Sequence, residues 1–338
     1  MNEKIRYLGQ HILKVVVTGA AGFIGSHVTK SLIDKGYDVV LADNFSSGSV
    51  QNLRDLGVVK GYVVGDLQNY SFARRAIKGA DVVYHFAADI GNVEYLHGSG
   101  QRELITMQSN LLIDANVFRA CLENKVKSLM YASSVSVYPI DEQVGGDRYL
   151  EEEDSERKVN PEGGYGWAKL IAEKQLSMMR DVHIGIARIF HAYGKNIYLK
   201  SDRSQVMASL MVKAIKYPSD KFVIWGDGRQ KRCFVYIDDV IDGLNRLYEY
   251  VTTKENLTVN IGSQEEVTID GLAKLIVNIS GKHIEPEHDL TKPYGALQRR
   301  PDLKRVREKL GWDVKTSLTS GLKETYSWAT SRVVQDKI

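Results

Sequence analysis

The sequence predicts an α/β fold built on a doubly wound parallel sheet, with a smaller lobe towards the C-terminus. Three observations lead to this prediction. Short apolar segments alternate with helical patterns in the first half of the chain, a glycine-rich turn joins the first such segment to the first helix, and the alternation loosens after Phe190. Continuous apolar strands separated by helices are typical of a parallel sheet covered on both faces.

The expected elements follow one another in strand–helix order. We expect strands at 13–18, 37–42, 61–65, 81–86, 128–133 and 184–189, and helices at 23–35, 103–124 and 165–180. These elements make residues 1–190 the first domain, to which 234–263 is expected to return. Residues 191–233 and 264–338 then form the smaller, substrate-binding lobe, and we interpret the acidic run 151–156 as a solvated loop.

Composition limits the kind of protein this can be. Hydrophobic residues make up 43% of the 338 positions and charged residues 26%, as expected for a globular protein with a full core. A net charge of +3 is too small to suggest nucleic-acid or membrane partners. Cys121 and Cys233 lie far apart without metal-ligand spacing, so we expect neither a metal site nor a disulfide framework. With no leader-like or membrane-spanning apolar stretch, we expect a cytoplasmic protein.

The first strand runs directly into the segment GAAGFIG (19–25). Glycines allow the sharp turn and the close approach of a pyrophosphate, and the N–H groups of the first helical turn point at the phosphates. The spacing is GxxGxxG, so the GxGxxG fingerprint is only partly met, and a turn that binds nothing is the alternative. The residues expected to contact the phosphates of a dinucleotide on this Rossmann-like fold are Gly19, Gly22, Phe23, Ile24 and Gly25.

Acidic residues follow the next two strands. Asp43 lies 18 residues after Gly25, where a carboxylate can accept hydrogen bonds from an adenosine ribose and repels a 2′-phosphate, which favours NAD over NADP. Asp66 follows the third strand and is either a turn residue or an acceptor for an adenine amino group. The remaining expected cofactor contacts are the neighbours of these residues and the small residues after the fourth strand, namely Asn44, Leu67, Ala87 and Ala88.

Tyr165 and Lys169 stand four residues apart at the start of a helix, which places them on one face. A tyrosine has an ordinary pKa of about 10, and a nearby lysine and a cationic nicotinamide would lower that pKa towards neutrality. The same spacing occurs by chance on exposed helices. Here the fifth strand ends in Ser133 and Ser134, at the edge where such sheets bind ligands, which favours a catalytic role.

Nine motifs together resemble one family, the extended short-chain dehydrogenases that modify nucleotide sugars with NAD. The motifs are TGAAGFIGSH (18–27), ADN (42–44), GDL (65–67), HFAAD (85–89), YASSVSVY (131–138), YGWAK (165–169), RIFHAYG (188–194), WGDGRQKRCFVYIDD (225–239) and RRPD (299–302). The resemblance implies that Ser134, Tyr165 and Lys169 are catalytic and that Asn110 supports the site. It also implies that Arg232 and Arg300 hold the substrate diphosphate, although both could be surface charges.

Members of this family oxidise a sugar hydroxyl to a bound keto sugar, and further acids or bases determine which product forms from it. Dehydratases and decarboxylases carry an acidic residue just after the catalytic serine or threonine, where this chain has Val135 and Ser136. The chain looks closest overall to UDP-glucose 4-epimerase-like and GDP-mannose 3,5-epimerase-like members. The latter use a cysteine and a lysine, and Ser136 and Gln205 fall at or near those positions.

We therefore expect C4 epimerisation of a nucleotide hexose through a 4-keto intermediate. One alternative is 3,5-epimerisation or C4 oxidation of a GDP-sugar; Lys200 and Arg203 lie close to Gln205 in the same loop, near the expected lysine position. The other alternative is a protein that binds NAD without catalysis. His191 replaces the asparagine usual in RxFNxYG and either touches substrate or packs under the loop. The sequence leaves UDP and GDP open. The resemblance also implies a homodimer through the helices 103–124 and 165–180.

Overall fold

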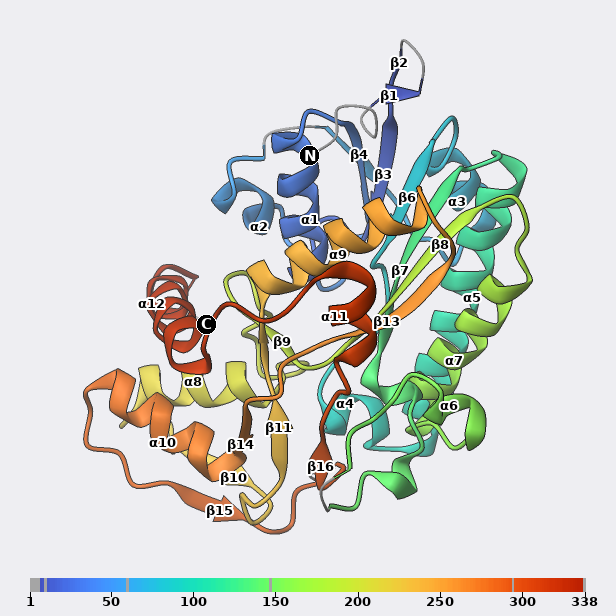
Figure 1. Cartoon of the computed structure of the whole chain (residues 1–338). Helices are drawn as coiled ribbons and strands as arrows, with labels where there is room; N and C mark the ends of the chain where they lie inside the picture. Colours follow the sequence, from blue (N-terminus) through green and yellow to red (C-terminus); the bar gives the residue numbers. More distant parts are fainter. Residues whose placement is uncertain (1–6, 9–10, 59–60, 146–147, 294, 337–338) are drawn as a thin grey trace.

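The computed structural model describes residues 7–8, 11–58, 61–145, 148–293 and 295–336, and its centre is a seven-stranded parallel sheet (Figure 1). The strands are β3 (Lys14–Thr18), β4 (Asp38–Asp43), β5 (Tyr62–Val64), β6 (Val82–His85), β7 (Ser128–Ser134), β8 (His183–Ile189) and β13 (Leu257–Ile261). Their order is β5-β4-β3-β6-β7-β8-β13, so the chain reverses direction across the sheet between β3 and β6. Ligands bind at such reversal points, beyond the carboxyl ends of the strands.

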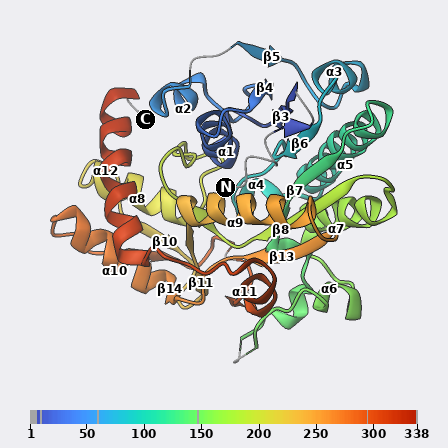
Figure 2. The ribbon, with the colours of Figure 1, turned by 45° about the horizontal axis from the view of Figure 1, so that its top comes forward.

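Both faces of this sheet are covered by helices (Figure 2). One face carries α1 (Phe23–Asp34) and α9 (Ile237–Val251), and the other carries α3 (Tyr70–Ala76), α5 (Gly100–Glu123) and α7 (Gly163–Met178). Side chains alternate along a strand, so Val15 and Val17 pack into one buried cluster and Val16 into the other. The predicted doubly wound α/β fold is confirmed, and the strand boundaries lie within one or two residues of those expected.

Segments after β8 build a smaller lobe next to the sheet (Figure 1). Its elements are β9 (Ala192–Tyr193), α8 (Val206–Lys216), β10 (Val223–Trp225), β11 (Lys231–Cys233), β12 (Val235–Tyr236), β14 (Glu266–Thr268), α10 (Ile269–Ser280), β15 (Glu287–Asp289), β16 (Gln298–Arg299) and α12 (Leu318–Asp336). Strands β14, β11 and β16 form one sheet in that order, and β10 pairs with β15. Within the segment 234–263, β13 joins the main sheet and α9 packs against that sheet, and α11 (Lys304–Leu310) packs on both of them.

The remaining elements are short: β1 (Tyr7–Leu8), β2 (His11–Ile12), α2 (Val50–Asp55), α4 (Val93–His97), two 3₁₀ turns (Val135–Val137 and Ile140–Glu142) and α6 (Asp154–Arg157). Our interpretation of 151–156 as a solvated loop was wrong. Glu152 and Asp154 are buried, and hydrogen bonds satisfy both side chains. The Glu152 carboxylate accepts the backbone N–H of Asn260, and the Asp154 carboxylate accepts that of Glu151. Within the described ranges, no helix has the length and apolar character that crossing a membrane requires.

Candidate active site

A cavity of about 1150 Å³ opens at the carboxyl edge of the sheet and continues into the smaller lobe. Sites for one drug-sized ligand measure about 300–1,000 Å³, so there is room for more than one small molecule. All of the residues expected to be catalytic or to contact cofactor or substrate line this cavity, except Arg300: Gly19, Gly22, Phe23, Ile24, Gly25, Asp43, Asn44, Asp66, Leu67, Ala87, Ala88, Ser134, Ser136, Tyr165, Lys169, His191 and Arg232.

The glycine turn packs too tightly for side chains. Gly19 has φ +66°, and a Cβ there would lie 2.7 Å from the backbone nitrogen of Ala87. A Cβ on Gly25 would lie 2.0 Å from the carbonyl oxygen of Gly19. Helix α1 begins after Gly22, and no side chain in this fully described segment caps its first N–H groups. Those uncapped donors fit the pyrophosphate of a dinucleotide.

Asp43 ties the glycine turn to the loop that follows β4. Its two carboxylate oxygens accept the backbone N–H groups of Ala21 at 2.8 Å and Phe45 at 2.7 Å. Burial raises the pKa of Asp43, and these N–H groups oppose that rise. Each oxygen keeps a lone pair for a further donor, so Asp43 can also accept a ribose hydroxyl. Asp66 is exposed and accepts the N–H of Gln68 at 2.8 Å, as a turn residue does, while still lining the cavity.

Tyr165, Lys169 and Ser134 meet on one wall of the cavity. Ser134 ends β7, and its side chain shares a hydrogen bond with Tyr165, which lies in the first turn of α7. The Ser134 oxygen also accepts the backbone N–H of Ser136 at 3.1 Å. Lys169 is buried, and its ammonium group donates to the carbonyl oxygen of Ala132 at 3.0 Å. The sheet edge and the helix start therefore fix this trio from two sides.

The surroundings of Tyr165 act on its pKa in opposite directions. Burial raises the pKa of the Tyr165 hydroxyl above its usual value, the carboxylate of Asp114 adds to the rise, and the hydrogen bond with Ser134 opposes it. The Lys169 nitrogen lies 5.9 Å from the centre of the Tyr165 ring. The lowering of the Tyr165 pKa that we expect from Lys169 together with a cationic nicotinamide stays a prediction.

Two arginines stand side by side in the smaller lobe. Arg232 of β11 is the register partner of Arg299 of β16, so both side chains emerge on one face, and both line the cavity. Burial, and then the charge of Arg299, lowers the pKa of Arg232 to about 9. A bound anion would relieve that repulsion. Arg300 lies outside the cavity lining, with its guanidinium donating to both carboxylate oxygens of Glu266 at 2.7 and 3.0 Å.

Glu162 is a carboxylate at the cavity wall that the sequence did not point to. It forms an ion pair with Arg299 at 2.5 Å and accepts the Ser136 hydroxyl at 3.2 Å. Burial favours its neutral form, but the charge and hydrogen bond of Arg299 outweigh burial and hold the pKa of Glu162 below its usual range. Its position, three residues before Tyr165, was the available signal.

His191 both lines the cavity and packs under the loop. Its ring lies edge-on to Phe234, with centres 5.8 Å apart, and its backbone has φ +38°. Burial, followed by the charges of Arg232 and Arg299, holds the pKa of His191 well below its usual value. The buried Nδ1 atom finds no hydrogen-bond partner among the described residues. A neutral imidazole with one open nitrogen results.

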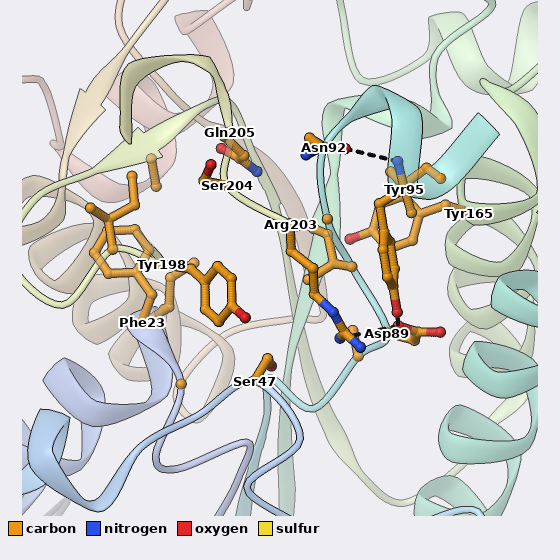
Figure 3. A pocket seen from close by; sticks show the side chains of 18 of the residues that line it. Phe23, Ser47, Asp89, Asn92, Tyr95, Tyr165, Tyr198, Arg203, Ser204 and Gln205 are labelled. Atoms are coloured by element: carbon orange, nitrogen blue, oxygen red, sulfur yellow. Dashed lines mark hydrogen bonds and ion pairs between the residues drawn. The ribbon is translucent and has the colours of Figure 1, made fainter. Parts of the chain in front are cut away.

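A strap, residues 199–205, reaches from the smaller lobe to the loop after β6. Arg203 of the strap lies 3.6 Å from a carboxylate oxygen of Asp89, and its guanidinium is 4.4 Å from the centre of the Tyr95 ring (Figure 3). Arg102 packs 3.8 Å from that ring centre, and both it and the Tyr95 hydroxyl donate to Asp89. Arg203 is more than 100 residues away from Asp89 and Tyr95 in the sequence, so the sequence did not reveal these two contacts.

Asn110, expected to support the site, braces the same loop. Its side chain accepts the N–H of Asp89 and donates to the Asp89 carbonyl, both at 2.9 Å. Gln205 and Lys200 of the strap line the cavity as well. The strap and the loop after β6 therefore face each other across the site.

Known proteins are similar to this chain in both sequence and fold. The chain is 30% identical to GDP-mannose 3,5-epimerase 1 of Oryza sativa subsp. japonica over 340 residues, which cover 99% of this chain and 86% of the relative. UDP-glucose 4-epimerase of Thermotoga maritima, solved with UDP-glucose, is 25% identical with a TM-score of 0.83, covering 95% of this chain and all of that one. UDP-glucuronic acid 4-epimerase of Bacillus cereus, solved with UDP-glucuronic acid and NAD, is 26% identical with a TM-score of 0.82, covering 94% and 99%.

A family-level match agrees with these similarities. Residues 15–262 match the NAD dependent epimerase/dehydratase family, a span that includes the glycine turn, Tyr165 and Lys169. The chain belongs to the NAD dependent epimerase/dehydratase family.

Proposed function

We propose that this protein inverts C4 of a hexose carried on a nucleotide diphosphate, using bound NAD. The observation that carries the proposal is the meeting of Ser134, Tyr165 and Lys169 on the wall of a cavity that also reaches the glycine turn and the paired arginines. The similarity to solved UDP-sugar 4-epimerases supports it.

Each residue has a part in this chemistry. Ser134 donates a hydrogen bond to the C4 oxygen, and Tyr165 takes the C4 hydroxyl proton as base and later returns it. Lys169 places a positive charge 5.9 Å from the centre of the Tyr165 ring. When bound, NAD supplies the acceptor and donor of the C4 hydride and a cationic ring that favours the Tyr165 phenolate. Arg232 and Arg299 hold the diphosphate, so the keto sugar can turn its other face while the nucleotide stays in place.

Elimination and decarboxylation are disfavoured, because no acidic residue directly follows Ser134. Val135 and Ser136 follow the catalytic serine, and Glu162 is held as a carboxylate by Arg299. The second candidate is 3,5-epimerisation of a GDP-sugar, favoured by the 30% identity to the rice enzyme. Both Ser136 and Gln205 line the cavity. By the resemblance, Ser136 falls at the cysteine position and Gln205 near the lysine position of that branch, but an alcohol and an amide are poor acids and bases for a ring carbon.

A panel of nucleotide sugars tests the proposal. Purified protein is incubated with UDP- and GDP-hexoses, and the products are separated by chromatography. We expect one sugar to form its C4 epimer without added NAD. Failure of the whole panel to convert would contradict the function, and solvent deuterium at C3 or C5 would select the second candidate.

The arginine pair gives a specific binding prediction. Replacement Arg232→Met should raise KM for the nucleotide sugar about 10- to 100-fold, because it removes a charge-assisted hydrogen bond worth about 1.5–3 kcal/mol. NAD affinity should not change. The matched control is Arg300→Met, which removes the same charge outside the cavity. Equal KM changes in the two variants would contradict the assignment.

We also infer a homodimer. Exposed apolar side chains lie on α5 and α7, which pack together on one face of the sheet: Leu104, Ile105, Leu112, Leu122, Trp167 and Met178. Such a patch on paired helices suits association with a second copy of the chain. A monomeric mass in sedimentation at micromolar concentration would contradict this inference.

A further inference from the structure

A buried network of hydrogen-bonded polar side chains lies behind the cavity wall that carries Tyr165, Lys169 and Ser134. The Thr18 hydroxyl lies 2.6 Å from Nδ1 of His85, and Nε2 of His85 lies 2.9 Å from one carboxylate oxygen of Asp114. The other Asp114 oxygen accepts the Tyr131 hydroxyl at 2.9 Å. All four side chains are buried almost completely. This hydrogen-bond network starts beside Ala87, an expected cofactor contact, whose backbone N–H donates to the Thr18 hydroxyl.

The partners fix the direction of these hydrogen bonds. A carboxylate only accepts, so His85 carries its proton on Nε2 and accepts the Thr18 hydroxyl proton on Nδ1. Burial lowers the pKa of His85, although Asp114 opposes that shift, so the imidazole is neutral. His85 therefore orients Asp114 without cancelling its charge.

Lys169 lies next to Tyr131, the last side chain of this hydrogen-bond network. Its ammonium nitrogen is 4.5 Å from the centre of the Tyr131 ring, whose hydroxyl donates to Asp114. A phenol that donates to a carboxylate presents a more negative ring face, which favours a cation above it. Burial lowers the pKa of Lys169, and Asp114 is the strongest opposing charge, followed by Glu173.

The second carboxylate is already committed elsewhere. Glu173 accepts two hydrogen bonds from the guanidinium of buried Arg188, at 2.6 and 3.0 Å, and a third from the Ser133 hydroxyl. Arg188 therefore offsets the charge of Glu173. Of the two carboxylates that raise the pKa of Lys169, this leaves Asp114 as its counter-charge.

We propose that Asp114 is a positioning residue that holds Lys169 as an ammonium ion through the ring of Tyr131. The inference deepens the proposed function, since it rests on the roles of Lys169 and Tyr165. Asp114 raises the pKa of Tyr165 as well as that of Lys169. Removal of its charge must therefore move the titration of both groups to lower pH.

Absorbance titration of the Tyr165 phenolate tests this without any sugar. The chain holds 18 tyrosines, so the signal is isolated as wild type minus Tyr165→Phe, in NAD-loaded protein. In the Asp114→Asn background, the same difference should titrate about 1 pH unit lower. The matched control, Glu123→Gln, removes a surface carboxylate from the same helix and should give no shift. An unshifted Tyr165 titration in folded Asp114→Asn protein would overturn the proposal.

A double-mutant cycle covers the case in which Asp114→Asn destabilises the fold. If Asp114 serves as the counter-charge of Lys169, Asp114→Asn should lower Tm more in the wild-type background than in Lys169→Met. Equal losses in both backgrounds, or failure to fold in both, would show a purely structural role and overturn the proposal. Neither measurement needs turnover, so a negative nucleotide-sugar panel leaves this inference open to its own test.

Discussion

Replacement Tyr165→Phe is expected to lower kcat by about 10²- to 10⁴-fold, the usual contribution of a positioned acid–base group. The variant keeps the buried aromatic ring, so NAD affinity and thermal stability should stay close to wild type. Initial rates with the nucleotide sugar converted in the panel, together with NAD titration by fluorescence, measure both effects. Tyr70→Phe, which removes a hydroxyl outside the cavity, is the control and should keep full activity.

The pH dependence has its origin in the same residue. Because burial raises the pKa of Tyr165 and the base must be deprotonated to act, kcat/KM should rise from neutral to alkaline pH. The residual activity of Tyr165→Phe should lose that rise. Full activity of the variant, or an unchanged pH profile, would remove Tyr165 from the reaction.

Replacement Gly25→Ala is expected to abolish NAD binding and to destabilise the fold by about 1–3 kcal/mol. The new methyl group would lie 2.0 Å from the carbonyl oxygen of Gly19 and 2.8 Å from its carbonyl carbon, so backbone has to move. That backbone forms the turn at the first N–H groups of α1, which are the expected phosphate donors.

NAD titration and thermal melting measure both effects. Gly100→Ala is the matched control, because a Cβ there meets no atom within 4 Å and the residue starts helix α5. NAD binding of wild-type strength in Gly25→Ala would show that the dinucleotide lies elsewhere.

The sheet was predictable because its strands are buried on both faces. Runs such as Val15 to Val17 read as continuous apolar segments, and glycines mark the turns between strands and helices. The acidic run 151–156 was misread for a physical reason. Buried Glu152 and Asp154 are satisfied by backbone N–H groups, and Arg188 donates to the Glu152 carbonyl from 36 residues away. Local composition does not reveal such distant partners.

The candidate site was predictable where its residues are close in sequence. Spacing puts Tyr165 and Lys169 on one helix face and the glycines in one turn, and Ser134 at the end of the fifth strand favoured a catalytic role for the pair. The choice between Arg299 and Arg300 depended instead on the pairing of β16 with β11, which directs only Arg299 to the side of Arg232. Contact between Arg203 and Asp89 likewise depends on how the two lobes meet.

The most direct test traces the hydrogen on C4. A nucleotide hexose carrying deuterium at C4 is converted by the protein in ordinary water, and the product is examined by NMR and mass spectrometry. Transfer of the C4 hydride to bound NAD and back predicts an inverted C4 that keeps its deuterium, with a slower rate than the unlabelled sugar. Loss of the C4 label to water would contradict C4 inversion by hydride transfer, as would deuterium at C3 or C5 of the product when the unlabelled sugar is converted in heavy water.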